Sequence, residues 1–141
     1  MRIANISDIQ YIVPLLASHY GEDKMEGIEF YLSTRIRNTF ENTYMLNEDN
    51  NLLFMFERIG NFKCQFHVYS LPEVRGRGMK KEFLGALTSL PQYSCFLTFV
   101  PNKDNKAAHV AARSVGGKLL AVVPDAGGKG NNEALYVIGG K

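Results

Sequence analysis

A strand that runs through a glycine-rich, basic turn into a helix restricts the possible folds of this chain more than any other feature. Apolar and polar side chains alternate over residues 62–69, as in a β-strand whose two faces meet different surroundings. Apolar residues then recur at helical spacing over 79–90, and Pro91 ends the pattern. The turn between these elements contains Gly76 and Gly78. Backbone N–H groups in such a turn bind phosphate at a helix N-terminus, although a tight connection with solvated arginines has the same pattern.

The rest of the sequence indicates an α/β fold with a mixed sheet and helices on both faces. A helix with a kink or an early break is expected over 7–21, because Pro14 lies inside it and Ser7 is placed as its N-cap. The other expected elements are a helix over 25–36, a hairpin of 43–46 and 52–56, a strand over 94–100, a helix from Asp104 or Asn105 to Gly116, and strands over 119–123 and 134–138. The resulting order, ααββββαβαββ, contains one crossover.

The same periodicities assign side chains to the core. In the strand over 62–69, one face is expected to carry Phe62, Cys64, Phe66 and Val68, and the other Lys63, Gln65, His67 and Tyr69. In the helix over 79–90, the buried side is expected to carry Met79, Phe83, Leu84, Leu87 and Leu90.

Composition excludes several classes of protein. The chain has 141 residues, of which 45% are apolar, and this predicts a single domain over 1–141 with an ordinary core. No apolar run is longer than that of 52–56, which is far short of the roughly 18 residues that a membrane helix needs. With no secretory leader at Met1, a cytoplasmic location is expected. The two cysteines, Cys64 and Cys95, are expected to be reduced core thiols, and no metal site is expected.

Charge is distributed unevenly along the sequence. The net charge is +2, yet residues 1–73 hold 6 basic and 10 acidic side chains and the remainder hold 10 and 4. An anionic ligand would therefore favour the second half. Four positive charges gather around the glycine turn, at Arg75, Arg77, Lys80 and Lys81. They suit a local anion site rather than the broad basic face of a nucleic-acid binder.

Three segments together resemble the GNAT superfamily of acetyl-CoA-dependent N-acetyltransferases. The opening residues 1–9 are similar to that family's first strand and helix, and residues 72–79, Pro-Glu-Val-Arg-Gly-Arg-Gly-Met, resemble its coenzyme loop. The segment from Asn105 to Ala108, followed by Gly116, resembles the family's N-x-x-A helix. The similarity in element order spans nearly the whole chain.

The resemblance implies a mostly antiparallel central sheet that is splayed between its fourth and fifth strands, with coenzyme A in the gap. It implies that the strand backbone at Tyr69 and Ser70 pairs with the pantetheine arm. The pyrophosphate would rest on N–H groups of the loop and the start of the next helix, contributed by Arg75, Gly76, Arg77, Gly78, Met79 and Lys80. Asn105 and Ala108 would line the cofactor from the following helix. Acetyl-CoA is the implied cosubstrate, without a metal.

The sequence also departs from the family pattern. Lys80 stands where the family has Gly or Ala, and its ammonium would either crowd the pyrophosphate or reach a phosphate as a point charge. The family's frequent acid, a tyrosine, is replaced by Ala112. The aromatic residue that usually follows the helix is replaced by Gly117.

No carboxylate lies between Glu57 and Glu73, where many family members place a general base on the fourth strand. Acetyl transfer to an amine needs a group that takes the amine's proton. His67 and Tyr69, on the polar face of the strand over 62–69, are the candidate catalytic residues, and both have an alternative interpretation as packing residues. His19 and His109 are expected to be surface residues.

Two functions remain open at this point. The first is an N-acetyltransferase that transfers an acetyl group to a primary amine of a small molecule, peptide or protein by direct attack within a ternary complex. The second is a catalytically inactive protein of the same fold with a binding or structural role, similar to GNAT-like virion or assembly proteins of tailed phages. The first function implies a cytoplasmic enzyme, either alone or as a homodimer. The second implies part of a larger viral assembly, in the host cytoplasm or in the virion. The acidic residues Glu22, Asp23, Glu26 and Glu29 form either a patch that attracts a polyamine or lysine-rich peptide or an ordinary solvated helix face.

Overall fold

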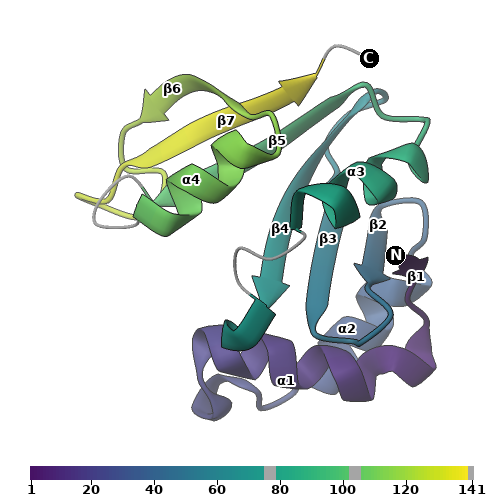
Figure 1. Ribbon diagram of the computed structural model, residues 1–141. Coiled ribbons are helices and arrows are strands. Elements are labelled where there is room, and N and C mark those ends of the chain that lie inside the picture. The colour runs from purple at the N-terminus through teal and green to yellow at the C-terminus, as the bar shows by residue number, and fades with distance from the viewer. Residues whose placement is uncertain (75–78, 102–105, 140–141) are drawn as a thin grey trace.

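The computed structural model describes residues 1–74, 79–101 and 106–139 and contains one seven-stranded sheet of order β1-β2-β3-β4-β5-β7-β6 (Figure 1). The strands are β1 (Arg2–Ile3), β2 (Asn42–Leu46), β3 (Leu52–Arg58), β4 (Lys63–Ser70), β5 (Cys95–Pro101), β6 (Lys118–Val123) and β7 (Glu133–Gly139). Every neighbouring pair is antiparallel except β4 and β5, which are parallel. A parallel pair needs a crossover, and the connection through α3 (Met79–Thr88) supplies it.

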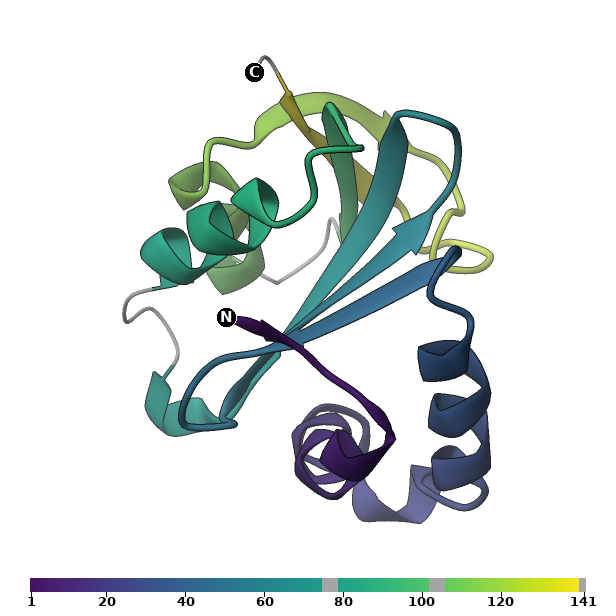
Figure 2. The ribbon, with the colours of Figure 1, turned by 90° about the vertical axis from the view of Figure 1, so that its right-hand side faces the viewer.

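Helices cover both faces of the sheet. Figure 2 shows α1 (Ile9–Tyr20) and α2 (Ile28–Arg37) on one side, and α3 and α4 (Lys106–Ser114) on the other. Short 3-10 turns precede α1, join it to α2 and follow β4, at Ile6–Asp8, Glu22–Lys24 and Pro72–Val74. The fold class expected from the sequence, a mixed α/β sheet with helices on both faces, is confirmed.

The core between the sheet and α3 is built from phenylalanine rings. Phe83 of α3 is fully buried and lies 4.9 Å from the ring of Phe66 and 5.4 Å from that of Phe54, measured between ring centroids. Phe56 and Phe96 complete the cluster, so α3 is held against three consecutive strands. Aromatic pairs at these separations add roughly 0.5–1.5 kcal/mol each beyond the area that they bury.

The opposite face of the sheet packs against α1 and α2. Ile12 and Leu16 of α1, Leu32 of α2 and Leu53 of β3 are all buried in this second cluster. Tyr69 joins them from β4, because it lies on the face opposite to Phe66. The alternation predicted for β4 therefore directs one set of its side chains toward α3 and the other set toward α1 and α2.

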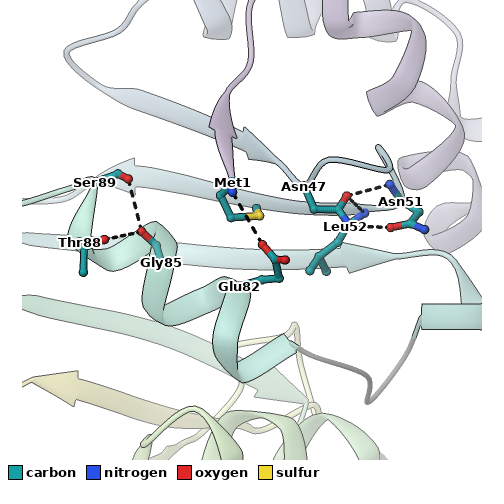
Figure 3. Close-up of polar contacts among 8 residues, drawn as sticks. All are labelled: Met1, Asn47, Asn51, Leu52, Glu82, Gly85, Thr88 and Ser89. Atoms are coloured by element: carbon teal, nitrogen blue, oxygen red, sulfur yellow. Dashed lines mark hydrogen bonds and ion pairs between the residues drawn. The ribbon is translucent and has the colours of Figure 1, made fainter.

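Polar contacts hold the ends of these layers together (Figure 3). In the turn between β2 and β3, the Asn47 side-chain oxygen accepts hydrogen bonds from the backbone N–H groups of Asn51 and Leu52, each at 3.0 Å. The amino group of Met1 lies 3.7 Å from the Glu82 carboxylate of α3. The polar turn that the sequence predicts thus closes on itself, and β1 is anchored to the helix beside it.

The start of the chain differs from the sequence-based expectation. Asn5, not Ser7, caps the first helical turn, because the Asn5 side chain accepts from the Ser7 N–H at 2.9 Å while the Asp8 carboxylate accepts from the Asn5 N–H. Pro14 does not break α1, which continues to Tyr20, and its ring is solvent-exposed. The order predicted from the sequence was also wrong: three strands separate α2 from α3, and the missing one is β1, before α1.

Two residues expected in the core are exposed. Phe62 is 70% exposed and precedes β4, and its carbonyl accepts hydrogen bonds from the Ser94 and Cys95 N–H groups at the start of β5. Leu84 is 46% exposed, since α3 presents Phe83, Ala86 and Leu87 to the sheet. In the part of the chain that the structure describes, no helix is long and apolar enough to span a membrane.

Because Phe83 is fully buried and contacts rings from both β3 and β4, Phe83→Ala is expected to lower the free energy of unfolding by about 3–5 kcal/mol. Urea denaturation followed by circular dichroism measures this change. Leu84→Ala is the matched control on the same helix, and its exposure predicts a change within about 0.5 kcal/mol. Equal effects of the two substitutions would contradict the described orientation of α3.

Candidate functional site

The parallel pairing of β4 and β5 stops after three residues, and this opens the centre of the sheet. Lys63–Gln65 of β4 pair with Cys95–Leu97 of β5. One further contact follows, in which the buried Thr98 hydroxyl donates to the Phe66 carbonyl at 3.1 Å. Beyond it β4 continues to Ser70 and β5 to Pro101 with no pairing between them among the described residues, and Figure 1 shows the two strands moving apart. The splayed sheet implied by the sequence is confirmed.

The phase of the β3–β4 ladder determines which backbone groups of β4 face this gap. The Leu71 N–H donates to the Asn51 carbonyl at 3.1 Å, and hydrogen-bonded pairs alternate along an antiparallel ladder. The backbone of Tyr69 is therefore bonded to β3, whereas the N–H and C=O groups of Val68 and Ser70 point to the β5 side. The end of β4 thus presents two donors and two acceptors to the gap, and none of the four has a partner among the described residues.

His67 lies on the α1–α2 face of the sheet, beside the point of divergence. It is half-buried, pairs across the ladder with Met55 and is diagonal to Glu57. Burial lowers the pKa of His67, and the positive charges of Arg35 and His19 act in the same direction, whereas the carboxylates of Glu57 and Glu133 oppose the shift. The imidazole is consequently neutral near pH 7, the state in which it accepts a proton.

Tyr69, the second catalytic candidate, lies on the same face with its hydroxyl directed at α1. Its Oη is 2.6 Å from the Oη of Tyr20, and the rings of His19 and Tyr69 meet edge to face at 5.1 Å. Burial and the Tyr20 hydrogen bond raise the pKa of Tyr69, so the hydroxyl stays protonated. This contact fastens the end of α1 to β4 next to His67, whose ring is 6.4 Å from that of Tyr69.

An arginine-centred network stands on the same face, between α2 and β3. The Arg35 guanidinium donates from Nε to the Tyr44 hydroxyl at 2.9 Å, and from Nη2 to the Asn42 side chain at 2.8 Å and the Glu57 carboxylate at 2.9 Å. Three of these side chains, Arg35, Asn42 and Glu57, border a cavity of about 280 Å³ that is also lined by Thr34, Asn38 and Glu41. Both charges of the Arg35–Glu57 ion pair act on His67.

The residues proposed to bind the cofactor are divided between described and undescribed segments. Ser70 ends β4, Met79 and Lys80 form the first turn of α3, and Ala108 lies half-buried in α4, against the cluster around Tyr136. Arg75, Gly76, Arg77 and Gly78 lie outside the described residues, as do Asn105 and the predicted helix cap at Asp104. Those assignments remain predictions.

Local geometry explains one departure from the family pattern. A Cβ on Gly117 would lie 2.5 Å from the Ala112 carbonyl oxygen, and the Gly117 N–H donates to that same oxygen at 2.9 Å. No side chain fits there without a shift of the backbone. Ala112 is itself buried against the ring of Tyr136 from β7, so the space beside α4 is filled from another strand.

The remaining histidine and cysteine predictions have mixed outcomes. His109 is not a free surface residue, because its Nδ1 lies 2.7 Å from the Tyr136 hydroxyl and its Nε2 lies 3.2 Å from the Pro101 carbonyl oxygen. His19 is exposed, as expected, although its ring contacts Tyr69. Cys64 is a free, buried thiol whose pKa burial raises to about 12, and Cys95 is free and half-buried. Among the described residues, no group of His, Cys, Asp or Glu is placed to hold a metal.

Sequence reasoning missed four residues of this region: Arg35, Glu57, Thr98 and Glu133. Glu57 precedes the fourth strand in the sequence, yet the β3–β4 register brings it diagonal to His67. The signal that identifies it is the register of the hairpin: Glu57 lies two positions from Met55, the residue that pairs with His67. Arg35, Thr98 and Glu133 reach the region through packing and register, which leave no local pattern.

No family model matches the sequence, and no curated protein matches it. Solved structures do match over almost the whole chain. An acetyltransferase from Salmonella typhimurium that modifies the N-terminal serine of ribosomal protein L7/L12 is 14% identical, with a TM-score of 0.80, covering 99% of this chain and 94% of that one. A variant spermidine N-acetyltransferase from Vibrio cholerae is 15% identical, with a TM-score of 0.74, covering 98% of this chain and 93% of that one.

A GNAT-superfamily phosphinothricin acetyltransferase from Sinorhizobium meliloti, solved with acetyl-CoA, is 16% identical, with a TM-score of 0.68, covering 98% of this chain and 86% of that one. These similarities establish the fold, which is that of the GNAT N-acetyltransferases. The fold implied by the sequence motifs is therefore confirmed.

Since burial is the main influence on His67, NMR titration of its ring protons is expected to give a pKa below the ordinary value near 6.5. His67→Gln identifies the resonance by its disappearance. A pKa above 6.5 would show that the imidazole is solvated or dominated by Glu57 and Glu133, and would contradict the buried position.

Proposed function

We propose that this chain is an acetyl-CoA-dependent N-acetyltransferase that transfers the acetyl group to a primary amine by direct attack within a ternary complex. The observation that carries the proposal is the gap between β4 and β5, into which the backbone groups of Val68 and Ser70 point with no partner in the described part of the chain, beside a neutral, half-buried imidazole at His67. Unpaired backbone N–H and C=O groups along a strand are a template for pairing with another extended chain. A ligand with amide groups, such as the pantetheine arm of coenzyme A, would satisfy them by strand-like pairing.

The basic residues around the start of α3 suit the other end of such a ligand. Met79 and Lys80 form the first turn of this helix, whose N-terminus favours an anion. In the proposal the pyrophosphate is held there and by the loop of Arg75, Gly76, Arg77 and Gly78. Asn105 and Ala108 border the cofactor from the α4 side, and no metal takes part.

In the proposed reaction the thioester supplies an activated carbonyl carbon. The lone pair of the amine nitrogen attacks this carbon, the carbon–sulfur bond breaks, and coenzyme A leaves as a thiolate that takes up a proton. His67 accepts the proton that the nitrogen loses as the new bond forms. A backbone N–H of Val68 or Ser70 donates to the carbonyl oxygen as negative charge develops on it. Tyr69, fixed by Tyr20, keeps the His67 side of the site packed.

The acceptor is an amine of a small molecule or of a peptide or protein, and the proposal places the enzyme in the cytoplasm. The alternative is a catalytically inactive protein of the same fold that acts through protein contacts, such as a phage virion or assembly component. Ala112 and Gly117 stand where the family usually has a tyrosine and another aromatic residue, and these replacements are compatible with both functions. Binding of the cofactor separates them.

Calorimetric titration with acetyl-CoA is expected to show micromolar binding that Gly78→Glu abolishes, because a carboxylate would stand beside the pyrophosphate. Gly85→Glu is the matched control: it makes the same change within α3, where a Cβ meets nothing within 4 Å. Binding also stabilises the native state, so the melting temperature is expected to rise with ligand concentration. Absence of binding at millimolar acetyl-CoA would contradict the proposed acetyltransferase activity and favour the catalytically inactive alternative.

With an accepted amine in hand, His67→Gln is expected to lower kcat by about 10²–10⁴-fold, the usual contribution of a general base. The Kd for acetyl-CoA is expected to stay unchanged, since His67 faces α1 and α2 whereas the cofactor is held by β4 backbone. An unchanged kcat would assign proton removal to another group or to water.

A further inference from the structure

Arg35 is held rigidly, yet part of its guanidinium is unused. Its Nε and both hydrogens of Nη2 donate to Tyr44, Asn42 and Glu57. Among the described residues, Nη1 has no hydrogen-bond partner, and the side chain is 24% exposed at the cavity of about 280 Å³. A fixed guanidinium with a free terminal nitrogen is suited to a charge-assisted hydrogen bond with a carboxylate oxygen.

The same cavity offers a group of opposite charge. Glu41 lines it and has no ion-pair partner among the described residues, in contrast to Glu57, whose charge Arg35 neutralises. Asn38 and Thr34 add an amide and a hydroxyl to the lining. One open cation and one open carboxylate in a small polar cavity complement a zwitterion better than they complement a simple cation or anion.

The cavity lies within reach of the proposed base. Glu57 borders it and is diagonal to His67 across the β3–β4 ladder, on the same face of the sheet. Diagonal neighbours of this kind are roughly 7–8 Å apart. The extended side chain of a basic amino acid spans such a distance between its head group and its terminal amine.

We propose that the cavity beside Arg35 binds the zwitterionic head of a free α-amino acid, whose side-chain amine is the acetyl acceptor. The inference rests on the proposed function. The Arg35 Nη1 group donates to the α-carboxylate and Glu41 accepts from the α-ammonium, so the acceptor is of the lysine or ornithine class. Its terminal nitrogen forms the bond to the acetyl carbon and gives its proton to His67. The carbon–sulfur bond breaks, and coenzyme A leaves as a thiolate that takes up a proton.

Three related amines test the two halves of this head group. Lysine carries both charges, cadaverine lacks the carboxylate, and ε-aminocaproate lacks the α-ammonium. Binding of each is measured by calorimetry without acetyl-CoA, and acetylation of each is measured separately. Lysine is expected to bind roughly 10-fold to 100-fold more tightly than cadaverine, the value of a charged hydrogen-bonded contact.

Two variants assign the contacts. Arg35→Met is expected to weaken lysine and ε-aminocaproate roughly 10-fold to 100-fold without weakening cadaverine, because loss of the guanidinium also leaves the Glu57 carboxylate in the cavity lining without its ion-pair partner. Glu41→Gln keeps the Arg35 network and is expected to weaken lysine but not ε-aminocaproate. Arg37→Met, an exposed arginine of the same helix outside the cavity lining, is the matched control and is expected to leave all three unchanged. Melting temperatures confirm that each variant folds.

Equal binding of lysine and cadaverine, or an Arg35→Met effect that is the same for both, would overturn the proposal. Nα-acetyl-lysine amide distinguishes a free amino acid from a lysine residue in a protein: tight binding of this compound would also overturn it. The proposed function fails differently, by absence of acetyl-CoA binding or of acetylation of every amine, while the calorimetry with lysine still decides the occupancy of the cavity.

Discussion

The early end of the β4–β5 pairing is the constraint on which the rest of this structure depends. A parallel pair inside an otherwise antiparallel sheet brings together strands that are joined only through α3, so neither hairpin nor local turn holds them in register. Two separate clusters then support the two ends of β5. Phe96 packs with Phe83 under α3 at the paired end, whereas Val100 packs with Tyr136 under α4 at the open end. Since each end of β5 has its own helix, the two strands remain apart beyond the Thr98 hydroxyl, which makes the last contact between them among the described residues.

The divergence of β4 and β5 makes backbone groups of Val68 and Ser70 available to a ligand. The side chains packed on the α1–α2 face of the sheet determine the charge around His67. Burial favours the neutral imidazole, and the two members of the Arg35–Glu57 ion pair act on it in opposite directions. The carboxylate nearest in the ladder is therefore largely neutralised by α2. The same ion pair fixes Arg35 at the edge of the polar cavity, so the environment of the base and recognition of an acceptor depend on one contact.

Several elements of the fold were predictable because their signals are local. The alternation over residues 62–69, the polar turn after Leu46 and the stop at Pro91 each involve neighbours in sequence, and each led to the correct element. Errors arose where distant contacts decide the outcome. Leu84 fits the helical period but faces solvent, because the rings of β3 and β4 receive Phe83 instead. The predicted loop and helix cap around Gly78 and Asn105 lie outside the described residues, so that part of the site stays a prediction.

The amino-acid sequence by itself determined most of the secondary-structure elements, the mixed sheet and the position of a basic, glycine-rich segment before a helix, because hydrophobic periodicity and turn residues act over a few neighbouring residues. Only the tertiary structure decided which groups meet. The Arg35–Glu57 ion pair joins residues 22 positions apart, and the Thr98–Phe66 hydrogen bond joins residues 32 apart. Such contacts depend on strand register and on which face of a helix meets the sheet, and a single shift in register would turn His67 to the other side.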